Sequence, residues 1–391
     1  MTDTSPHLRP RDGSEHPTTS VELFFDLVYV FAVTQLSHLL SAHLNFPGAG
    51  RTAFLLLVVW WAWIYTTWMV NWFEPNSIKV RLILIAATLA SLLMSAAIPS
   101  AFGAHALLFA GAYVAMQVGR NLFCAALLSR DHALRQTFQR LVAWSVVSGA
   151  LWIAGALAPS SLRFALWGPA LAIDLLAPIA GYWLPGRGRA QTTDYPVEGG
   201  HFAERFQAFI IIALGESIVV TGASASAKGL TGTVVLALAV AFFVTGALWW
   251  LYFGEIAEHS RRYLAEAENP GALARDAYSY LHLPIVAGVI MVAVGDGLLI
   301  AHPSHELSSA GVTMLVGGPA LYLFGESLFR LRMIGSVNPK RMLAVGALCL
   351  LGLLSGRLSA LALSAFVAAL LTALALWEYD STPRSALPAI Q

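Results

Sequence analysis

The chain has 391 residues, of which 57% are hydrophobic and only 12% are charged, and its mean hydropathy is +0.67. A soluble globular domain carries about 25% charged residues, so the composition excludes a soluble protein and predicts a polytopic all-α membrane protein with the lipid bilayer as its surroundings. The formal net charge is +1, which excludes the strongly basic surface typical of a nucleic-acid-binding protein.

Membrane-spanning helices need roughly 20 apolar residues. Residues 1–20 are polar and contain no apolar stretch of the kind found in a signal peptide, so we expect a short tail there. The apolar runs after this tail predict about twelve spans: 21–44, 53–73, 80–99, 103–125, 139–158, 163–183, 203–224, 231–253, 277–300, 310–329, 341–356 and 358–378. The eleventh is the weakest because it is short and is closed by Arg357.

The positions of Lys and Arg predict the orientation of these spans. With the first tail in the cytoplasm, 19 of the 23 Lys and Arg residues fall on the cytoplasmic side or at that end of a span. The other four are Arg51, Arg163, Lys228 and Arg357. Because Lys and Arg favour the cytoplasmic side, we expect both termini to be cytoplasmic.

Two motifs recur at nearly the same offset and indicate an internal repeat. Glu22 and Glu204 are 182 residues apart, and Glu74 and Glu255 are 181 apart. Six spans are an even number, so two six-helix halves would enter the membrane from the same side and form a parallel repeat. The expected organisation is a tail at 1–20, a first repeat at 21–183, a cytoplasmic linker at 184–200, a second repeat at 201–379 with a cytoplasmic helical insertion at about 256–276, and a tail at 380–391.

Acidic residues inside the spans are the best indication of function, because a charge at the bilayer centre costs roughly 2.5–3.5 kcal/mol on insertion scales. Asp174 and Glu216 lie near the centres of their predicted spans, and we expect no Lys or Arg at that depth. Each is therefore expected to be protonated or to face a hydrated cavity that binds cations or protons. Structural hydrogen bonding is the alternative for both. Asp296 and Glu326 lie nearer span ends and are secondary candidates.

Glu22 and Asp26 lie one turn apart on one face of the first span. Thr19 precedes Glu22 by three residues, so Glu22 also fits a capping box. Asp26 lies inside the apolar run, where a structural ion pair with Arg205 or Arg120 is the alternative to a role in transport.

The first and seventh spans carry polar residues at matching depths. Under the 182-residue offset, Thr34 corresponds to Glu216 and Gln35 corresponds to Ser217. This symmetry predicts a pathway lined by these two spans. The candidate pathway residues are Glu22, Asp26, Tyr29, Thr34, Gln35, Asp174, Glu204, Gln207, Glu216 and Ser217.

The sequence contains no enzyme signature such as a phosphate-binding loop, a His-Glu-x-x-His motif or a Gly-x-Ser-x-Gly turn. Its two cysteines, Cys124 and Cys349, lie far apart in apolar runs and have no metal-ligand spacing. We therefore expect neither a metal nor a cofactor, and an enzyme is less favoured than a transport protein.

The motif ELFFDLVYVFAVTQL at 22–36, together with ERF at 204–206 and LGESI at 214–218, resembles the bacterial low temperature requirement A family over nearly the whole chain after residue 20. The resemblance implies a multi-pass protein of the bacterial cytoplasmic membrane. The family name reflects growth in the cold and implies no particular biochemical activity.

A second, weaker likeness is to two-repeat potassium channels of the endolysosomal and bacterial kind, which have six plus six helices and a Phe-Ser-Asp motif in the first helix of each repeat. Phe24-Phe25-Asp26 is similar, whereas Phe206-Gln207-Ala208 lacks the acid. This likeness implies a homodimer with a pore lined by the first and seventh helices. The hydrophobic constriction would then be formed by Ile210, Ile211 and Ile212.

These observations predict a channel or transporter for a small ion or solute. One alternative is an intramembrane enzyme, such as a lipid-modifying protein linked to growth in the cold, in which Asp174 and Glu216 act as acid and base in one cavity. A non-catalytic membrane sensor or scaffold is the other alternative.

Overall fold

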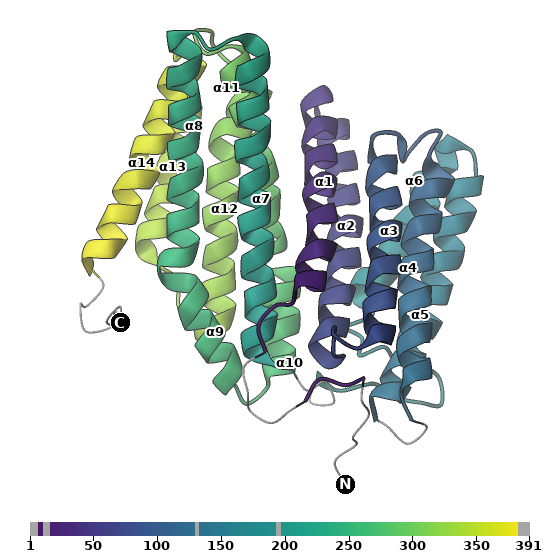
Figure 1. Ribbon diagram of the computed structural model, residues 1–391. Helices are drawn as coiled ribbons and strands as arrows, with labels where there is room; N and C mark the ends of the chain where they lie inside the picture. The colour runs from purple at the N-terminus through teal and green to yellow at the C-terminus, as the bar shows by residue number, and fades with distance from the viewer. Residues whose placement is uncertain (1–6, 11–15, 130–132, 193–196, 382–391) are drawn as a thin grey trace. The chain divides into compact units, whose positions relative to one another are not determined.

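The computed structural model describes residues 7–10, 16–129, 133–192 and 197–381 (Figure 1). Within these ranges the regular structure is helical, and the β-type pairing is limited to isolated bridges such as the one between Leu8 and Phe73. Ten helices of the described chain are long and apolar enough to cross a membrane. The predicted class is confirmed at this level: the chain is a multi-pass α-helical membrane protein.

The chain folds into two compact units. Unit 1 comprises Met1–Ala42, Phe46–Phe209 and Leu264–Ser279, and unit 2 comprises His43–Asn45, Ile210–Tyr263 and Tyr280–Gln391. The long helix α7 contributes its first residues to unit 1 and the rest to unit 2. The predicted tails at 1–20 and 380–391 and the predicted linker lie partly outside the described residues.

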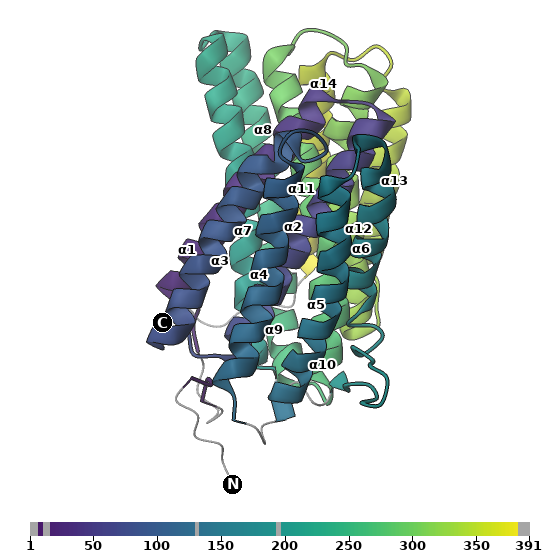
Figure 2. The same cartoon turned by 90° about the vertical axis from the view of Figure 1, so that its right-hand side faces the viewer.

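Unit 1 contains six helices and the start of a seventh. Their bounds are Ser20–Ala42 (α1), Phe46–Trp72 (α2), Ile78–Ala97 (α3), Ala106–Leu127 (α4), Ala133–Leu157 (α5), Ser160–Leu176 (α6) and Gly199–Lys228 (α7). Helices α3, α4 and α5 pack successively against one another, as Figure 2 shows. The short α10 (Pro270–Leu273) and most of a π-helical segment, Ala274–Tyr280, also belong to this unit.

Unit 2 contains the rest of α7 and the later helices. Their bounds are Gly232–Leu251 (α8), Ala257–Glu266 (α9, of which the last three residues belong to unit 1), Leu283–Ala301 (α11), Ser309–Ile334 (α12), Pro339–Leu354 (α13) and Ala360–Ser381 (α14). A π-helical segment, Tyr252–Ile256, joins α8 to α9. The predicted insertion at 256–276 therefore folds mostly as α9 and α10.

Short polar motifs set where several helices begin and end. The Thr19 backbone N–H donates to Glu22 Oε2 over 2.8 Å, which is the backbone half of the expected capping box at α1. The side chains of Thr231, Ser308 and Asn338 accept hydrogen bonds from the first turns of α8, α12 and α13. Helix α12 ends at Gly335, whose φ of 70° suits glycine.

Two of the predicted spans, the sixth and the eleventh, fold as helices that are shorter than a full membrane span. α6 has 17 residues and α13 has 16, or roughly 25 Å at 1.5 Å per residue, against a hydrocarbon core of about 30 Å. The predicted span 163–183 is wrong at its end, because α6 stops at Leu176. Gly181 and Tyr182 then adopt positive φ values of 61° and 47°, which no α-helix accommodates.

Aromatic side chains form the core of unit 1 where α1, α2 and α7 meet. Trp63 stacks on Trp60 with ring centroids 5.2 Å apart, and both rings contact Phe206 and Phe209 of α7. Tyr29 of α1 contacts Phe209 from the other side. The tryptophan-rich stretch of the second span is therefore mainly a packing element.

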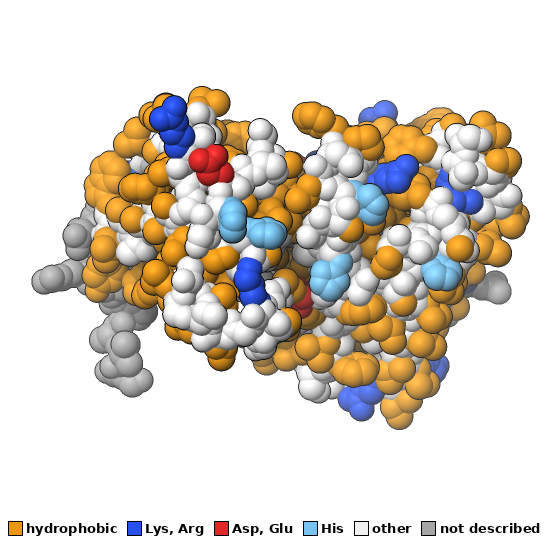
Figure 3. Space-filling view, turned by 90° about the horizontal axis from the view of Figure 1, so that it is seen from above, with side chains coloured by type: hydrophobic (Ala, Val, Ile, Leu, Met, Phe, Trp, Pro, Cys, Tyr) orange, Lys and Arg blue, Asp and Glu red, His pale blue; other side chains and the backbone are white. Residues whose placement is uncertain are grey.

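Close backbone approach holds α11 against α12 in unit 2. A Cβ added to Gly288 would lie 2.7 Å from the Tyr322 backbone nitrogen, and one added to Gly318 would lie 2.8 Å from the Val292 nitrogen. Small residues at such crossings are typical of helix packing in membranes. Large hydrophobic side chains such as Phe242, Phe243 and Leu353 are exposed, and the face seen in Figure 3 carries many hydrophobic side chains and only scattered charged ones.

Candidate functional site

A buried ion pair joins α1 to the first turns of α7 in unit 1. Arg205 donates to both carboxylate oxygens of Asp26, with distances of 2.7 and 2.8 Å. Trp63 Nε1 donates to Asp26 Oδ1 over 2.7 Å. All three side chains are fully buried. Of the two cations that the sequence offered as partners for Asp26, the structure selects Arg205, and the bidentate geometry is the strongest form of such a pair.

A second polar cluster lies one turn earlier and surrounds Glu22. His201 Nε2 lies 2.7 Å from Glu22 Oε1, and the Arg9 guanidinium lies 3.6 Å from the same oxygen. Asn71 of α2 contacts His201 Nδ1. Burial lowers the pKa of Arg9, and the neighbouring Glu22 carboxylate opposes that shift. Glu22 therefore makes both a capping contact and ionic contacts, and all of them are structural contacts at the start of α1.

Asp174 is held by three helices of unit 1. Its Oδ2 accepts hydrogen bonds from the Tyr113 hydroxyl at 2.9 Å and from Trp152 Nε1 at 3.0 Å. Its backbone carbonyl accepts one from Trp61 Nε1 at 2.9 Å. Asp174 lies near the end of α6 rather than halfway along it, which corrects the sequence-based register. Because Trp61 is near the middle of α2, Asp174 still lies level with the middle of a long span.

A hydrogen-bonded chain runs from Asp174 to a buried cation. Gln117 Nε2 donates to the Tyr113 hydroxyl over 3.2 Å, and the Arg120 guanidinium donates to Gln117 Oε1. Arg120 also donates to Thr66 Oγ1 over 3.0 Å and is 1% exposed. Arg120 lies inside α4, seven residues before Leu127, and it reaches Asp174 only through Gln117 and Tyr113.

Unit 2 buries an aspartate against a hydroxyl. Ser217 Oγ donates to Asp296 Oδ2 over 3.2 Å, and Asp296 is 3% exposed. Glu216, the neighbour of Ser217, is also buried and lies close to the middle of α7. Within the described part of the chain, Asp296 makes no ion pair and no other hydrogen bond.

An ionic cluster in unit 2 links α12, α13 and α14. Arg341 donates to Glu326 Oε2 and to Glu378 Oε2, each over 2.7 Å, and to the Leu251 carbonyl over 2.8 Å. Asn338 donates to Glu378 Oε1 over 2.7 Å. Glu326 is therefore a member of a structural triad, and the remaining oxygen, Oε1, has no hydrogen-bond partner among the described residues.

The remaining predicted pathway residues all lie in unit 1. Tyr29 hydrogen-bonds to Ser91 of α3 over 3.0 Å, and Thr34 donates to the Val30 carbonyl of its own helix. Glu204 accepts from the Thr18 backbone N–H over 3.2 Å. Gln35 and Gln207 are half-buried.

The predicted constriction residues differ in exposure. Ile210 is fully buried, Ile212 is half-buried and Ile211 is 51% exposed. Three consecutive residues of a helix point about 100° apart, so they do not share one face of α7. Their role as a constriction stays a prediction.

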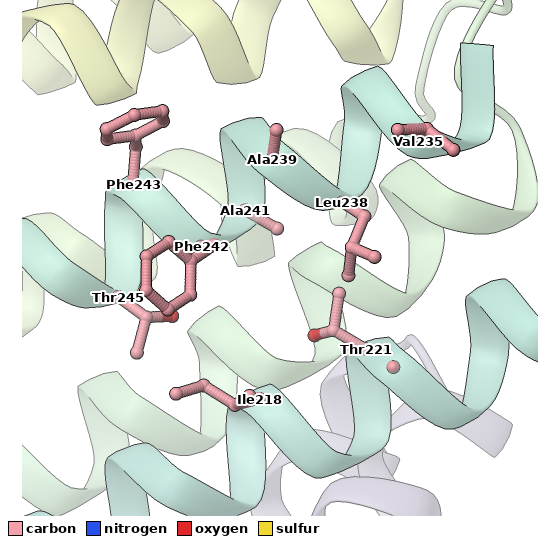
Figure 4. A pocket seen from close by; sticks show the side chains of 10 residues that line it. Ile218, Thr221, Val235, Leu238, Ala239, Ala241, Phe242, Phe243 and Thr245 are labelled. Carbon is pink, nitrogen blue, oxygen red and sulfur yellow. The ribbon is translucent and has the colours of Figure 1, made fainter. Parts of the chain in front are cut away.

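A groove in unit 2 opens between α7 and α8. Its volume is about 480 Å³, and Figure 4 shows Ile218 and Thr221 of α7 facing Leu238 and Thr245 of α8 across it. Two threonine hydroxyls are the polar groups among its otherwise apolar lining side chains and glycine. This lining suits apolar chains rather than a charged solute.

Neither the hydrogen-bonded chain that ends at Arg120 nor the triad centred on Arg341 was predicted from the sequence. The signal for Arg120 was present, because an arginine fell inside the predicted span 103–125 and such residues are functional candidates by default. Gln117 lies four residues after Tyr113 and three before Arg120, so these contacts follow the spacing of α4. Only the contact of Tyr113 with Asp174 depends on how α4 packs against α6. Asp174 belongs to unit 1 and Glu216 to unit 2. Among the described residues no group of three or more His, Cys, Asp or Glu is arranged to hold a metal.

Comparisons with known proteins agree with the resemblance seen in the sequence. A family model described as Bacterial low temperature requirement A protein (LtrA) matches residues 18–376. An uncharacterised protein of Rhizobium meliloti (strain 1021) is 34% identical over 375 residues, which cover 95% of this chain and 91% of that relative. No solved structure matches the chain. The chain therefore belongs to the bacterial low temperature requirement A family.

Proposed function

We propose that the protein is a proton-coupled transporter of a small solute in the bacterial cytoplasmic membrane, with Asp296 as the carboxyl that binds the proton. The observation that carries the proposal is the environment of Asp296. Its carboxyl is buried in unit 2, and within the described chain it receives one hydrogen bond, from the neutral hydroxyl of Ser217.

A charged side chain that is buried inside a membrane span is energetically costly. An ionised aspartate near a helix centre costs roughly 2.5–3.5 kcal/mol on insertion scales. One neutral hydrogen bond contributes only about 0.5–1.5 kcal/mol net, which does not offset that cost. The neutral, protonated carboxyl is therefore the favoured form in this environment.

The carboxyl lies within the spans but toward one end of its own helix: Asp296 is five residues before the end of α11 at Ala301, or about 8 Å along that helix. Ser217 lies 11 residues before the end of α7 at Lys228, or about 16 Å along the helix. A carboxyl that keeps its proton while buried and releases it when water reaches it couples proton movement to a conformational change. Glu216, next to Ser217 in unit 2, is a further buried acid of the proposed pathway. The role of Asp174 in unit 1 stays a prediction from the sequence.

The proposal includes the parallel repeat of two six-helix halves. Corresponding pairs of helices are each joined by a polar contact, although not at equivalent positions: Tyr29 of α1 with Ser91 of α3, and Ser217 of α7 with Asp296 of α11. The fourth to sixth helices of each half are also tied by one buried polar cluster, around Asp174 in unit 1 and around Arg341 in unit 2. The distribution of Lys and Arg supports two cytoplasmic termini. A homodimer stays a prediction from the channel likeness.

Infrared spectra of the protein in lipid bilayers at neutral pH test the proposal. Asp296→Asn should remove a carbonyl stretching band of a protonated carboxyl in apolar surroundings. Glu306→Gln, a matched acid-to-amide change at an exposed position, should leave that band in place. Ser217→Ala should shift the same band to higher frequency, because the carboxyl loses its hydrogen bond. The proposal fails if Asp296→Asn removes a carboxylate band instead.

A further inference from the structure

Arg120 is a cation buried within unit 1, and no carboxylate of the described chain lies within ion-pair distance of it. It lies seven residues before the end of α4, or about 10 Å along the helix, and it is 1% exposed. A buried charge is costly unless it is paired and hydrogen-bonded. The surroundings of its guanidinium therefore indicate what this position is built to hold.

The guanidinium is only partly satisfied by its neighbours. Of its five N–H groups, one donates to Thr66 Oγ1 and one to Gln117 Oε1. The Tyr65 ring lies against it at 5.3 Å from the centroid. Its Nε–H has no acceptor among the described residues. Nε–H and a neighbouring Nη–H form the planar fork that binds the two oxygens of a carboxylate.

The nearest acid reaches Arg120 only through other side chains. Arg120 donates to Gln117, Gln117 donates to Tyr113, and Tyr113 donates to Asp174. Every donor in this chain points from the cation toward the acid, so each link polarises the next. Asp174 thus orients Gln117 and Tyr113 but leaves the fork of Arg120 without a direct counter-charge.

We propose that the interior of unit 1 binds a small monovalent carboxylate at Arg120, in a bidentate contact with its Nε–H edge and beside Tyr65, Thr66 and Gln117. A single guanidinium matches one negative charge. Gln117 Nε2 has a second N–H besides the one that it donates to Tyr113, whereas the Thr66 hydroxyl already donates to the Ala62 carbonyl. This inference rests on the proposed function for one point alone, namely that the bound carboxylate is the transported solute. Binding itself requires no proton coupling.

Acetate binding to the purified full-length protein tests the site. The melting temperature should rise saturably with sodium acetate, relative to sodium chloride at equal ionic strength, because a ligand of the folded state stabilises it. Arg120→Lys keeps the charge but loses the planar fork, so it should bind acetate roughly tenfold more weakly or worse. Arg51→Gln, a change at an exposed arginine of α2, should retain the wild-type response.

A further variant keeps the test decisive if Arg120 variants do not fold. Gln117→Glu is nearly isosteric and gives Arg120 its own carboxylate. It should melt at a higher temperature than wild type without acetate and should lose the acetate response. The inference is overturned if wild type shows no response beyond chloride, or if Gln117→Glu responds as wild type does. The Asp296 carboxyl band is measured separately, so either proposal can fail while the other stands.

Discussion

Asp26 and Arg205 carry opposite charges inside membrane spans, and both side chains are fully buried. Their bidentate contact and the hydrogen bond from Trp63 satisfy the carboxylate, whereas Arg205 Nε has no partner among the described residues. A buried ion pair of this kind stabilises the folded protein little compared with two apolar residues in the same place. Removing one partner, however, leaves the other as a buried charge without compensation. Asp26 is thus better explained as a connection between α1 and α7 than as an ion ligand.

We expect Asp26→Ala to lower the free energy of unfolding by about 3–5 kcal/mol, because Arg205 loses its buried counter-charge. Equilibrium unfolding of the detergent-solubilised protein measures the change. The double variant Asp26→Leu with Arg205→Met should recover most of the loss, since it removes both charges. A loss from Asp26→Ala of only about 1 kcal/mol, as for an exposed pair, would contradict this account.

Whether the sequence predicted the contacts of a residue depended on how far along the chain its partners lie. Glu22 was predicted as a cap because Thr19 lies within one turn of it, and the structure has that contact. Asp26 had two candidate cations, and only tertiary packing of α7 distinguished Arg205 from Arg120. Asp174 was identified as a buried acid, but its link through Tyr113 joins residues 61 positions apart, which no local pattern reveals.

At the scale of secondary-structure elements, the packing depends on how closely the helices approach one another. Helices α11 and α12 cross with Gly288 and Gly318 at the contact, where the backbone of each helix lies against the other. Dispersion contacts and close backbone packing hold membrane helices together, because lipid removes the hydrophobic driving force between them. A small residue at the crossing is therefore a structural requirement.

Gly288→Ala should destabilise the protein by about 1–3 kcal/mol, because the new methyl group would lie 2.7 Å from the Tyr322 nitrogen and force α11 and α12 apart. Thermal unfolding in detergent measures the effect. Gly297→Ala on the same helix is the matched control, since nothing lies within 4 Å of its added Cβ, and it should be neutral or stabilising. Equal melting temperatures for the two variants would disprove the packing argument.

Helix ends were less predictable than helix positions. The apolar run of the sixth span continues past Leu176, so its composition favoured a longer helix than the structure has. The turn at Gly181 and Tyr182 is instead held by tertiary contacts, including a hydrogen bond from the Tyr182 hydroxyl to that of Tyr65 at 3.1 Å. Such contacts carry no signature in the hydropathy of the segment.

At the scale of the whole molecule, low charge and high hydropathy were sufficient to identify a multi-pass helical membrane protein. The few charged residues inside it fall into two classes. Some are neutralised by direct partners, as Asp26 is by Arg205 and Glu326 is by Arg341. Others, such as Asp174, Asp296 and Arg120, have no direct counter-charge among the described residues, and the last two carry the proposed proton and anion sites.

Proton-coupled uptake into proteoliposomes tests the central claim most directly. An imposed acid-outside gradient should drive accumulation of a solute from a radiolabelled panel of small carboxylates, amino acids and sugars, with empty liposomes subtracted. A pH-sensitive dye enclosed in the liposomes should report proton entry that depends on that solute. Asp296→Asn should lose the dependence on the proton gradient, and Glu306→Gln should keep it. Solute movement that ignores the gradient in wild type, or that is unchanged in Asp296→Asn, would contradict the account.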